Sequence, residues 1–476
     1  MSEQLSPLDA TFLELEESDE SAHMHIGGLL VFDPAVGRGP PTLPELCEQL
    51  EQRLPTLPRY ADRLSAAHTG GLQWPAWEPD PGFDISAHVR RAALPAPGGD
   101  RELLEWVSDY WSHRIDRGRP LWEVVLLEGL PEGRWALVTK THHCMIDGVG
   151  SVDASHLLLD PSPDATESRP AAPAPPGEPG ERNGPGFWPV ELVRGGVHAG
   201  AGVAKAGLDA ARHPRHLAEA FQRSAALAEL IVRDELIAAP ASSLNGPIGT
   251  RRRFDMVEVP LEVLKDVKNA LGGTVNDAVL AVTSGALRRL LLSRGEEPPS
   301  DGLRAMVPVN LRASGDELAA GNRITSLFTR LPVAEVDPLV RYRRAAGEAE
   351  ALKSGSQALG GETLIDLAGH APPVLHAFIA RSLFATRLFN VTVTNVPGPQ
   401  MPLYAFGARL VRIAPLVPLA ADHALGVAVL SYDGRVTFGL NADFDSVPDL
   451  DVLREGIERS VAELTEMAEH AGASHP

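Results

Sequence analysis

The sequence has little cysteine, no long apolar run and no basic leader. Cys47 and Cys144 are the two cysteines in 476 residues, too few for a disulfide scaffold and typical of a reducing compartment. The most apolar segments are interrupted by charged residues such as Arg381, Arg412 and Asp422. None therefore approaches the run of about 18 apolar residues that crosses a bilayer. The N-terminal segment is acidic, so we expect no secretory signal.

Positive charge is also scarce. Lys and Arg number 43 against 63 Asp and Glu, which gives a formal net charge of -20 at pH 7. Binding to a nucleic-acid duplex needs a concentrated positive face, so this balance argues against a nucleic-acid partner. Local exceptions are the arginine run 251–253 and Arg304. These are candidates for contact with a phosphate, and the alternative is an ordinary solvated face.

Composition divides the chain into four parts. Residues 161–189 are rich in Pro, Ala and Gly, cannot pack a core, and are interpreted as a linker. Strand-like and helix-like patterns alternate before it, over 1–160, and later over 241–476, which predicts an α/β fold. Residues 190–240 are helix-prone and are interpreted as a helical connection. A lid or a membrane-facing helix pair is the alternative there.

Periodicity and turn residues place individual elements. Strands are predicted at 26–32, 121–127, 135–140, 305–309 and 389–394. Helices are predicted at 43–54, 103–115 and 276–292. A hairpin is expected where Asp433-Gly434 joins 426–430 to 436–439, because both turn residues tolerate a positive φ.

The most informative stretch is 142–148, which has the pattern H-H-x-x-x-D-G at the end of a predicted strand. Successive side chains on an extended backbone point to opposite faces, so one histidine faces a cleft and the other faces protein. A histidine in a cleft can act as a general base. The alternatives are two structural histidines, a metal site of His143, Cys144 and Asp147, or a Cys144 nucleophile.

Several separate segments resemble the bacterial wax ester synthase/acyl-CoA:diacylglycerol acyltransferase family, within the CoA-dependent acyltransferases that carry H-x-x-x-D. The resembling segments, in the family's order around the 142–148 stretch, are 5–13, 24–29, 83–95, 119–123, 274–277, 307–312, 321–322 and 395–399. The resemblance spans nearly the whole chain except roughly residues 160–240. It implies an α+β sandwich type of α/β fold, with two chloramphenicol-acetyltransferase-like subdomains flanking a central cleft.

The resemblance also implies roles within the motif. His143 matches the family's catalytic base, and His142 is expected to support the loop beneath it. Asp147 is expected to be structural and to face an arginine, for which Arg312 is the candidate. Gly148 gives backbone room beside the base.

Asn276 lies in a block that resembles the family's N-D motif. It either polarises the thioester oxygen and orients the alcohol, or caps the helix that follows. Asp277 would then lie in the first turn, where its charge suits the helix dipole.

Two further blocks supply candidate substrate contacts. The apolar block is Pro120, Leu121 and Trp122, a candidate wall of the acyl channel, with core packing as the alternative. The other block is Asn395, Pro397 and Gly398, expected to form a tight turn at the cleft.

The activity implied by the resemblance is O-acyl transfer from acyl-CoA to a lipid alcohol, which gives triacylglycerol from diacylglycerol or a wax ester from a fatty alcohol. A thiolate with a reference pKa of about 8.5 leaves readily, so direct transfer in a ternary complex needs no acyl-enzyme. No metal and no cofactor are expected, since acyl-CoA is a co-substrate. The alternatives are acyl transfer or condensation from a carrier-bound thioester, and a non-catalytic lipid-binding protein of the same fold.

The expected location is the cytoplasm, with peripheral contact to the inner membrane face or to lipid droplets through an apolar surface. That contact follows from the resemblance alone. The sequence leaves open the oligomeric state, the acyl length and the preferred acceptor, because pocket volume depends on side chains from distant segments.

Overall fold

Two six-stranded sheets organise the described part of the chain, which comprises residues 3–5, 7–65, 75–145, 157–164, 239–310, 324–354 and 388–473 of a computed structural model. Chain contacts separate Met1–Ala165 with Ala238–Pro476 from a second unit, Thr166–Ile237. The second unit lies outside the described residues. The predicted linker, apart from residues 161–164, and nearly all of the predicted helical connection lie outside them too, so the four-part division stays a prediction.

The first sheet is built mainly from the N-terminal half. Its strand order is β12 (Tyr404–Ala405), β13 (Ala408–Leu416), β2 (His25–Asp33), β7 (Trp135–His142), β6 (Trp122–Glu128) and β5 (Val89–Ala93). Almost every side chain of β6 and β7 is buried, as expected for strands that are covered on both faces. The helices of this half are α1 (Pro7–Ser18), α2 (Leu43–Arg53) and α3 (Asp100–Trp111).

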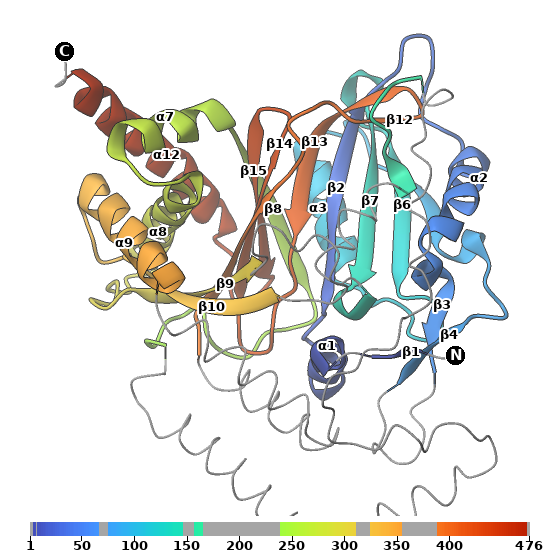
Figure 1. The fold of residues 1–476 in the computed structure, drawn as a ribbon, viewed down its shortest axis with the longest axis horizontal. Helices are drawn as coiled ribbons and strands as arrows, with labels where there is room; N and C mark the ends of the chain where they lie inside the picture. The colour runs from blue at the N-terminus through green and yellow to red at the C-terminus, as the bar shows by residue number, and fades with distance from the viewer. Residues whose placement is uncertain are drawn as a thin grey trace, which may run out of the picture. The chain divides into compact units, whose positions relative to one another are not determined.

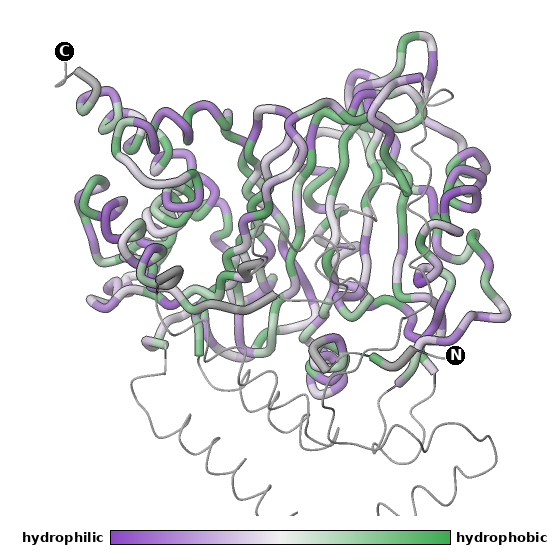
Figure 2. Tube along the Cα trace, viewed as in Figure 1, coloured by the Kyte–Doolittle hydropathy of each residue, from purple (hydrophilic) through white to green (hydrophobic). Residues whose placement is uncertain are grey.

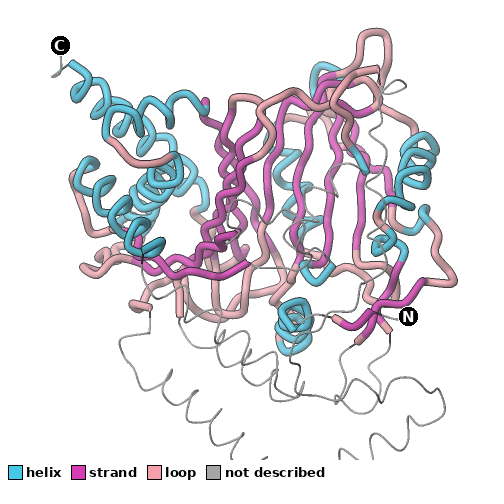
Figure 3. The backbone as a smooth tube through the Cα atoms, viewed as in Figure 1, coloured by secondary structure: helices cyan, strands magenta, loops and turns pink. Residues whose placement is uncertain are grey.

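The second sheet belongs to the C-terminal half. Its order is β10 (Ile324–Leu331), β9 (Leu303–Asn310), β11 (Val391–Pro397), β14 (Leu425–Tyr432), β15 (Arg435–Asp443) and β8 (Arg252–Pro260). Strand β11 runs parallel to both of its neighbours, while the other pairs are antiparallel. The helices that gather on one side of this sheet are α7 (Leu261–Leu271), α8 (Val275–Ser293), α9 (Pro338–Ser354) and α12 (Leu450–Ala473) (Figures 1 and 3).

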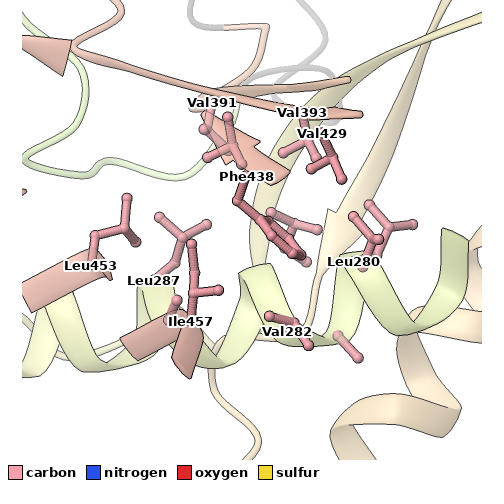
Figure 4. Close-up of a cluster of buried hydrophobic side chains, with 14 of the residues drawn as sticks. Leu280, Val282, Leu287, Val391, Val393, Val429, Phe438, Leu453 and Ile457 are labelled. Carbon is pink, nitrogen blue, oxygen red and sulfur yellow. The ribbon is translucent and has the colours of Figure 1, made fainter. Parts of the chain in front are cut away.

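Hydrophobic side chains between the second sheet and its helices form one core. Phe438 of β15 points toward α8, and Leu453 and Ile457 of α12 lie beside Leu287 of α8 in the same cluster (Figure 4). Hydrophobic residues run along the strands, whereas the helices alternate between hydrophobic and hydrophilic residues (Figure 2). This pattern is typical of amphipathic helices that cover a buried sheet.

The two halves are joined by strands that change sheet. Strands β12 and β13 come from the C-terminal half, yet β13 pairs antiparallel with β2, from Arg409 opposite Asp33 to Leu416 opposite Gly27. Gly439 of β15 approaches Pro415 of β13 so closely that an added Cβ would collide with the Pro415 carbonyl oxygen. A small third sheet of β1 (Glu3–Gln4), β4 (Ala76–Pro79) and β3 (Asp62–Leu64) lies apart from both.

The predicted α/β fold is confirmed, and most local predictions agree with the structure. The expected hairpin joins β14 to β15 through Asp433 and Gly434, whose φ values are 42° and 79°. The helix expected at 103–115 begins and ends earlier, at Asp100–Trp111. Of the tight turn expected at Asn395, Pro397 and Gly398, the first two positions are wrong, because β11 continues through Pro397. Within the described residues, no helix is both long enough and apolar enough to cross a membrane.

The contact at Gly439 gives a test of how the sheets meet. We expect Gly439→Ala to lower the free energy of unfolding by about 1–3 kcal/mol, because the new methyl group must push β13 and β15 apart. Urea denaturation measures the change. Gly39→Ala is the control, since a Cβ there meets no atom within 4 Å. Equal stabilities of the two variants would contradict the close approach.

Candidate functional site

The two motif histidines lie where β7 ends and a short 3₁₀ turn, His143–Met145, begins. Helix α1 lies beside the lower ends of β2 and β7 (Figure 1) and contacts this turn. The Phe12 ring of α1 stacks on the His143 ring, with the centroids 3.9 Å apart and the planes at 21°. The stacking holds the imidazole in one orientation.

His143 is suited to accept a proton. Burial lowers its pKa from 6.5 to about 4, and the neighbouring His142 lowers it further, while a hydrogen bond with its own backbone opposes them. Its Nδ1 has no hydrogen-bond partner outside its own residue among the described residues. The imidazole is therefore neutral at pH 7 and retains an unprotonated nitrogen for general-base chemistry.

Glu16 of α1 fixes the backbone on both sides of His143. In one arm, Oε2 of Glu16 accepts the Met24 N–H at 3.0 Å, and the Met24 carbonyl accepts the His143 N–H at 2.8 Å. In the other arm, the same oxygen lies 3.1 Å from Nε2 of His142. Nδ1 of His142 accepts the Cys144 N–H at 3.2 Å. We call this arrangement the Glu16 bracket.

The second arm of the Glu16 bracket also fixes the tautomer of His142. A backbone N–H can only donate, so Nδ1 of His142 must be unprotonated and Nε2 carries the hydrogen that Glu16 accepts. His142 consequently faces protein, beneath the turn. This placement agrees with the supporting role that the sequence predicts for it.

Glu16 is ionised although it is fully buried. Burial raises the pKa of its carboxyl group, but the His142 hydrogen bond, the nearby His142 and His25, and the Met24 N–H together lower that pKa well below its usual range. The nearest guanidinium nitrogen, Nε of Arg114, lies 4.0 Å away. Donors held by the fold, rather than a direct ion pair, therefore stabilise the charge.

Two more histidines pack around the Glu16 bracket. Nε2 of His25 lies 3.6 Å from Glu16, and the His25 ring is 5.8 Å from the rings of both His23 and His142. Burial lowers the pKa of His23 to about 4, assisted by the charges of Arg252 and Arg114. Burial likewise lowers the pKa of His25 well below 6.5. These rings are neutral at pH 7.

The alternative roles proposed for Cys144 find no support in the geometry. Its side chain is buried, and burial raises the pKa of its thiol well above 9.0, which keeps it a poor nucleophile. Among the described residues, no group of three or more His, Cys, Asp or Glu side chains could hold a metal ion. Asp147, the third residue of the suggested metal site, lies outside those residues.

The Pro120-Leu121-Trp122 block supports the motif from the neighbouring strand. The Leu121 carbonyl accepts the His142 N–H at 2.9 Å. Trp122 is 2% exposed, donates from Nε1 to the Tyr60 carbonyl at 2.8 Å, and stacks on His88 with centroids 4.7 Å apart. All three residues of the block are buried. Contact with an acyl chain stays a prediction.

Asn276 and Asn395 meet although 119 residues separate them in the chain. The Asn395 side-chain amide donates to Oδ1 of Asn276 at 3.2 Å. The alternative that Asn276 caps its helix is wrong, because Thr274 is the N-cap of α8 and exchanges hydrogen bonds with Asp277. Among the described residues, the Asn276 amide nitrogen has no hydrogen-bond acceptor. In the described part of the chain, no hydrogen bond links this pair to His143.

The remaining predicted residues are distributed as follows. Asp147, Gly148 and Arg312 lie outside the described residues. Gly398 directly follows β11, and a side chain there would collide with the Ser431 carbonyl oxygen. Arg252, one of the candidate phosphate-binding arginines, is buried and lies 3.9 Å from Asp443, so it is structural.

Comparison with known proteins identifies the family. Residues 5–279 match the wax ester synthase/diacylglycerol acyltransferase catalytic domain, and residues 320–465 match the WS/DGAT C-terminal domain. The chain belongs to the wax ester synthase/diacylglycerol acyltransferase family. A probable diacylglycerol O-acyltransferase of Mycobacterium tuberculosis is 34% identical over 468 residues, which cover 97% of this chain and 95% of that protein. A second one from the same organism is 34% identical over 462 residues, covering 97% and 98%.

Solved structures with a similar fold include a member of the same WS/DGAT family. The wax ester synthase/diacylglycerol acyltransferase from Marinobacter aquaeolei VT8 is 30% identical and superposes with a TM-score of 0.68, covering 98% of this chain and all of that one. The first condensation domain of the calcium-dependent antibiotic synthetase is 19% identical, with a TM-score of 0.58 and coverage of 98% and 96%. The latter shows the fold alone. These matches confirm the predicted two-subdomain architecture.

Sequence reasoning missed Glu16, which it counted only as part of an acidic N-terminal segment. A local signal was present. Phe12 and Glu16 are four residues apart and therefore share one face of α1, the face that contacts the His143 turn.

Among the histidines with lowered pKa values, the three around the motif predict acid sensitivity. His23, His25 and His143 bind protons more weakly in the folded state than in the unfolded state. The contribution of these neutral histidines to the free energy of unfolding is therefore present above pH 6.5. It is lost as the pH falls from 6.5 toward 4. We expect each histidine to cost about 1 kcal/mol of unfolding free energy between pH 7.5 and 5.5. Urea denaturation at both pH values measures the loss.

His23→Gln should reduce the loss of unfolding free energy between pH 7.5 and 5.5 by about 1 kcal/mol, the contribution of one histidine. His470→Gln, on the exposed end of α12, is the matched control and should leave the loss unchanged. If the wild-type protein is equally stable at the two pH values, these histidines are not held neutral.

Proposed function

We propose that His143 is the general base with which this acyltransferase moves a long-chain acyl group from acyl-CoA to the hydroxyl of a lipid alcohol. The observation that carries the proposal is the Glu16 bracket, which holds a neutral imidazole at the end of β7. Membership of the WS/DGAT family supplies the reaction class. The family's named acceptors are diacylglycerol and the alcohols of wax esters, so the product is triacylglycerol, wax ester or both.

The proposed reaction proceeds in a ternary complex. His143 takes the hydroxyl proton as the alcohol oxygen attacks the thioester carbonyl carbon, which gives a tetrahedral intermediate. Collapse breaks the carbon–sulfur bond, and the CoA thiolate takes the proton back from the imidazolium. A thiolate whose reference pKa is about 8.5 needs little assistance to leave, so an acyl-enzyme is unnecessary. A base with a pKa of about 4 returns its proton readily.

Asn276 is the candidate donor to the thioester oxygen. Its carbonyl oxygen is occupied by the Asn395 amide, which orients the Asn276 amide nitrogen away from that contact. A donor aimed at the developing oxyanion contributes about 10²–10³-fold in kcat. Asn276→Ala in the assay below should therefore lower kcat by that factor. Unchanged turnover would remove Asn276 from the reaction.

We further propose that the enzyme acts from the cytoplasm and meets its apolar acceptor at a membrane face or a lipid droplet. The acceptor alcohols are insoluble in water, which supports docking at a lipid surface. The lack of a membrane-crossing helix among the described residues is compatible with peripheral contact.

The test is CoA release from palmitoyl-CoA by purified protein, with hexadecanol or dioleoylglycerol offered in turn. We expect release to depend on the alcohol and to fall by about 10²–10⁴-fold in His143→Ala, because the base is lost. His470→Ala, on the exposed end of α12, is the control and should retain wild-type turnover. The alcohol that is used faster names the main product.

Two outcomes would contradict the proposal. If neither alcohol stimulates CoA release, the lipid acceptors are wrong, and carrier-bound thioesters become the substrates to try. If His143→Ala retains turnover near that of His470→Ala, a different group is the base.

A further inference from the structure

A large groove lies between α3 and β8, outside the motif and its bracket. Its volume is about 1210 Å³. One wall is the polar face of α3, and the other is β8 with Phe444 and the first turns of α12. Neither the predicted catalytic residues nor the Glu16 bracket line it, so its purpose needs a separate account.

The edge of β8 is not free to pair with another strand. β8 ends the second sheet, yet three of its alternate N–H groups are bonded to side chains. Ser112 Oγ accepts the Arg252 N–H at 2.7 Å, and Ser108 Oγ accepts the Phe254 N–H at 2.9 Å. The Met256 N–H bonds to Asp255 at 2.7 Å. Strand addition by a protein partner is therefore disfavoured, and a smaller ligand fits better.

Two arginines in the groove have no carboxylate partner among the described residues. The guanidinium carbons of Arg251 and Arg253 lie 3.6 Å and 4.3 Å from the centre of the Phe444 ring. Nη2 of Arg253 donates to the Phe444 carbonyl at 3.5 Å, and Nε of Arg253 is buried without an acceptor. By contrast, Arg412 lies 2.8 Å from Glu258 in the same groove. Stacked, unpaired guanidinium groups are suited to bind phosphate.

The inner end of the groove is connected to the catalytic turn. Arg252, which lines the groove, donates a hydrogen bond to the Ser21 carbonyl. Met24, three residues further along, holds the His143 N–H. Arg252 thus connects the groove to the backbone segment that positions His143.

We propose that Arg251 and Arg253 bind the phosphates of the nucleotide end of the acyl donor, so that the groove holds the phosphorylated adenosine of CoA. This inference rests on the proposed function, because it assigns the donor of that reaction to a place. The phosphate of an anionic lipid headgroup has the same chemistry, and the experiment separates the two sources.

The test compares two acyl donors that differ in the nucleotide. Palmitoyl-CoA carries it, and the palmitoyl thioester of N-acetylcysteamine lacks it. In the double variant Arg251→Gln/Arg253→Gln, we expect KM for palmitoyl-CoA to rise by about 10- to 100-fold and kcat/KM for the short thioester to stay unchanged. Adenosine 3′,5′-bisphosphate should compete with palmitoyl-CoA in the wild type and lose potency by the same factor in the variant.

Arg101→Gln is the matched control. Arg101 lines the same groove but lies 2.7 Å from Glu102, so its removal should leave both donors unaffected. If the double variant shows no thermal unfolding transition and is therefore not folded, the test is repeated with Arg251→Gln alone, a single change at an exposed position.

Three results would overturn the inference. The first is an unchanged KM for palmitoyl-CoA in the double variant. The second is an equal loss of kcat/KM with both donors. The third is a loss of binding to phosphatidylglycerol vesicles by the double variant without any change in KM. The last result would assign the arginines to lipid headgroups. If the wild type transfers from neither donor, the proposed function itself fails. If it transfers from both while the variant is unaffected, the groove assignment alone fails.

Discussion

The buried carboxylate of Glu16 is the interaction on which the candidate site depends. An ionised group at 1% exposure is costly unless its donors are fixed, and the fold supplies the Met24 N–H and the His142 imidazole. Both donors then determine the path of the backbone beside His143. The charge is retained because these donors, together with the nearby His25, lower the pKa of the Glu16 carboxyl group well below its usual range. The Glu16 carboxylate therefore determines both the position of His143 and the tautomer of His142.

The second sheet takes part in this arrangement through strands that connect the halves. β13 completes the first sheet by pairing with β2, the strand that begins at His25. β8 adds Arg252, whose guanidinium reaches the Ser21 carbonyl just before the segment that holds His143. The position of the base is consequently a property of both halves. The groove at β8 shares Arg252 with this connection.

Local patterns predicted much of the fold, and long-range contacts account for most of the rest. β2, β6, β7 and the hairpin at Asp433-Gly434 follow from alternation and turn chemistry within a few residues. The transfer of β13 into the first sheet depends on a partner strand in the other half of the chain, which no local pattern encodes. The role of Glu16 depends on a contact across 126 residues. Asn276 was open to two interpretations until Thr274 proved to be the cap.

The most direct test of the Glu16 bracket is a double-mutant cycle in kcat for CoA release, with Glu16→Leu, His142→Asn and the double variant. Leu has no acceptor for Nε2 of His142, and Asn keeps an acceptor for the Cys144 N–H but is too short to reach residue 16, so both single variants break the same contact. The account predicts that each loses about 10- to 100-fold in kcat and that the double variant loses no more than the worse single one. Losses that multiply would contradict it, because the two side chains would then act on His143 independently.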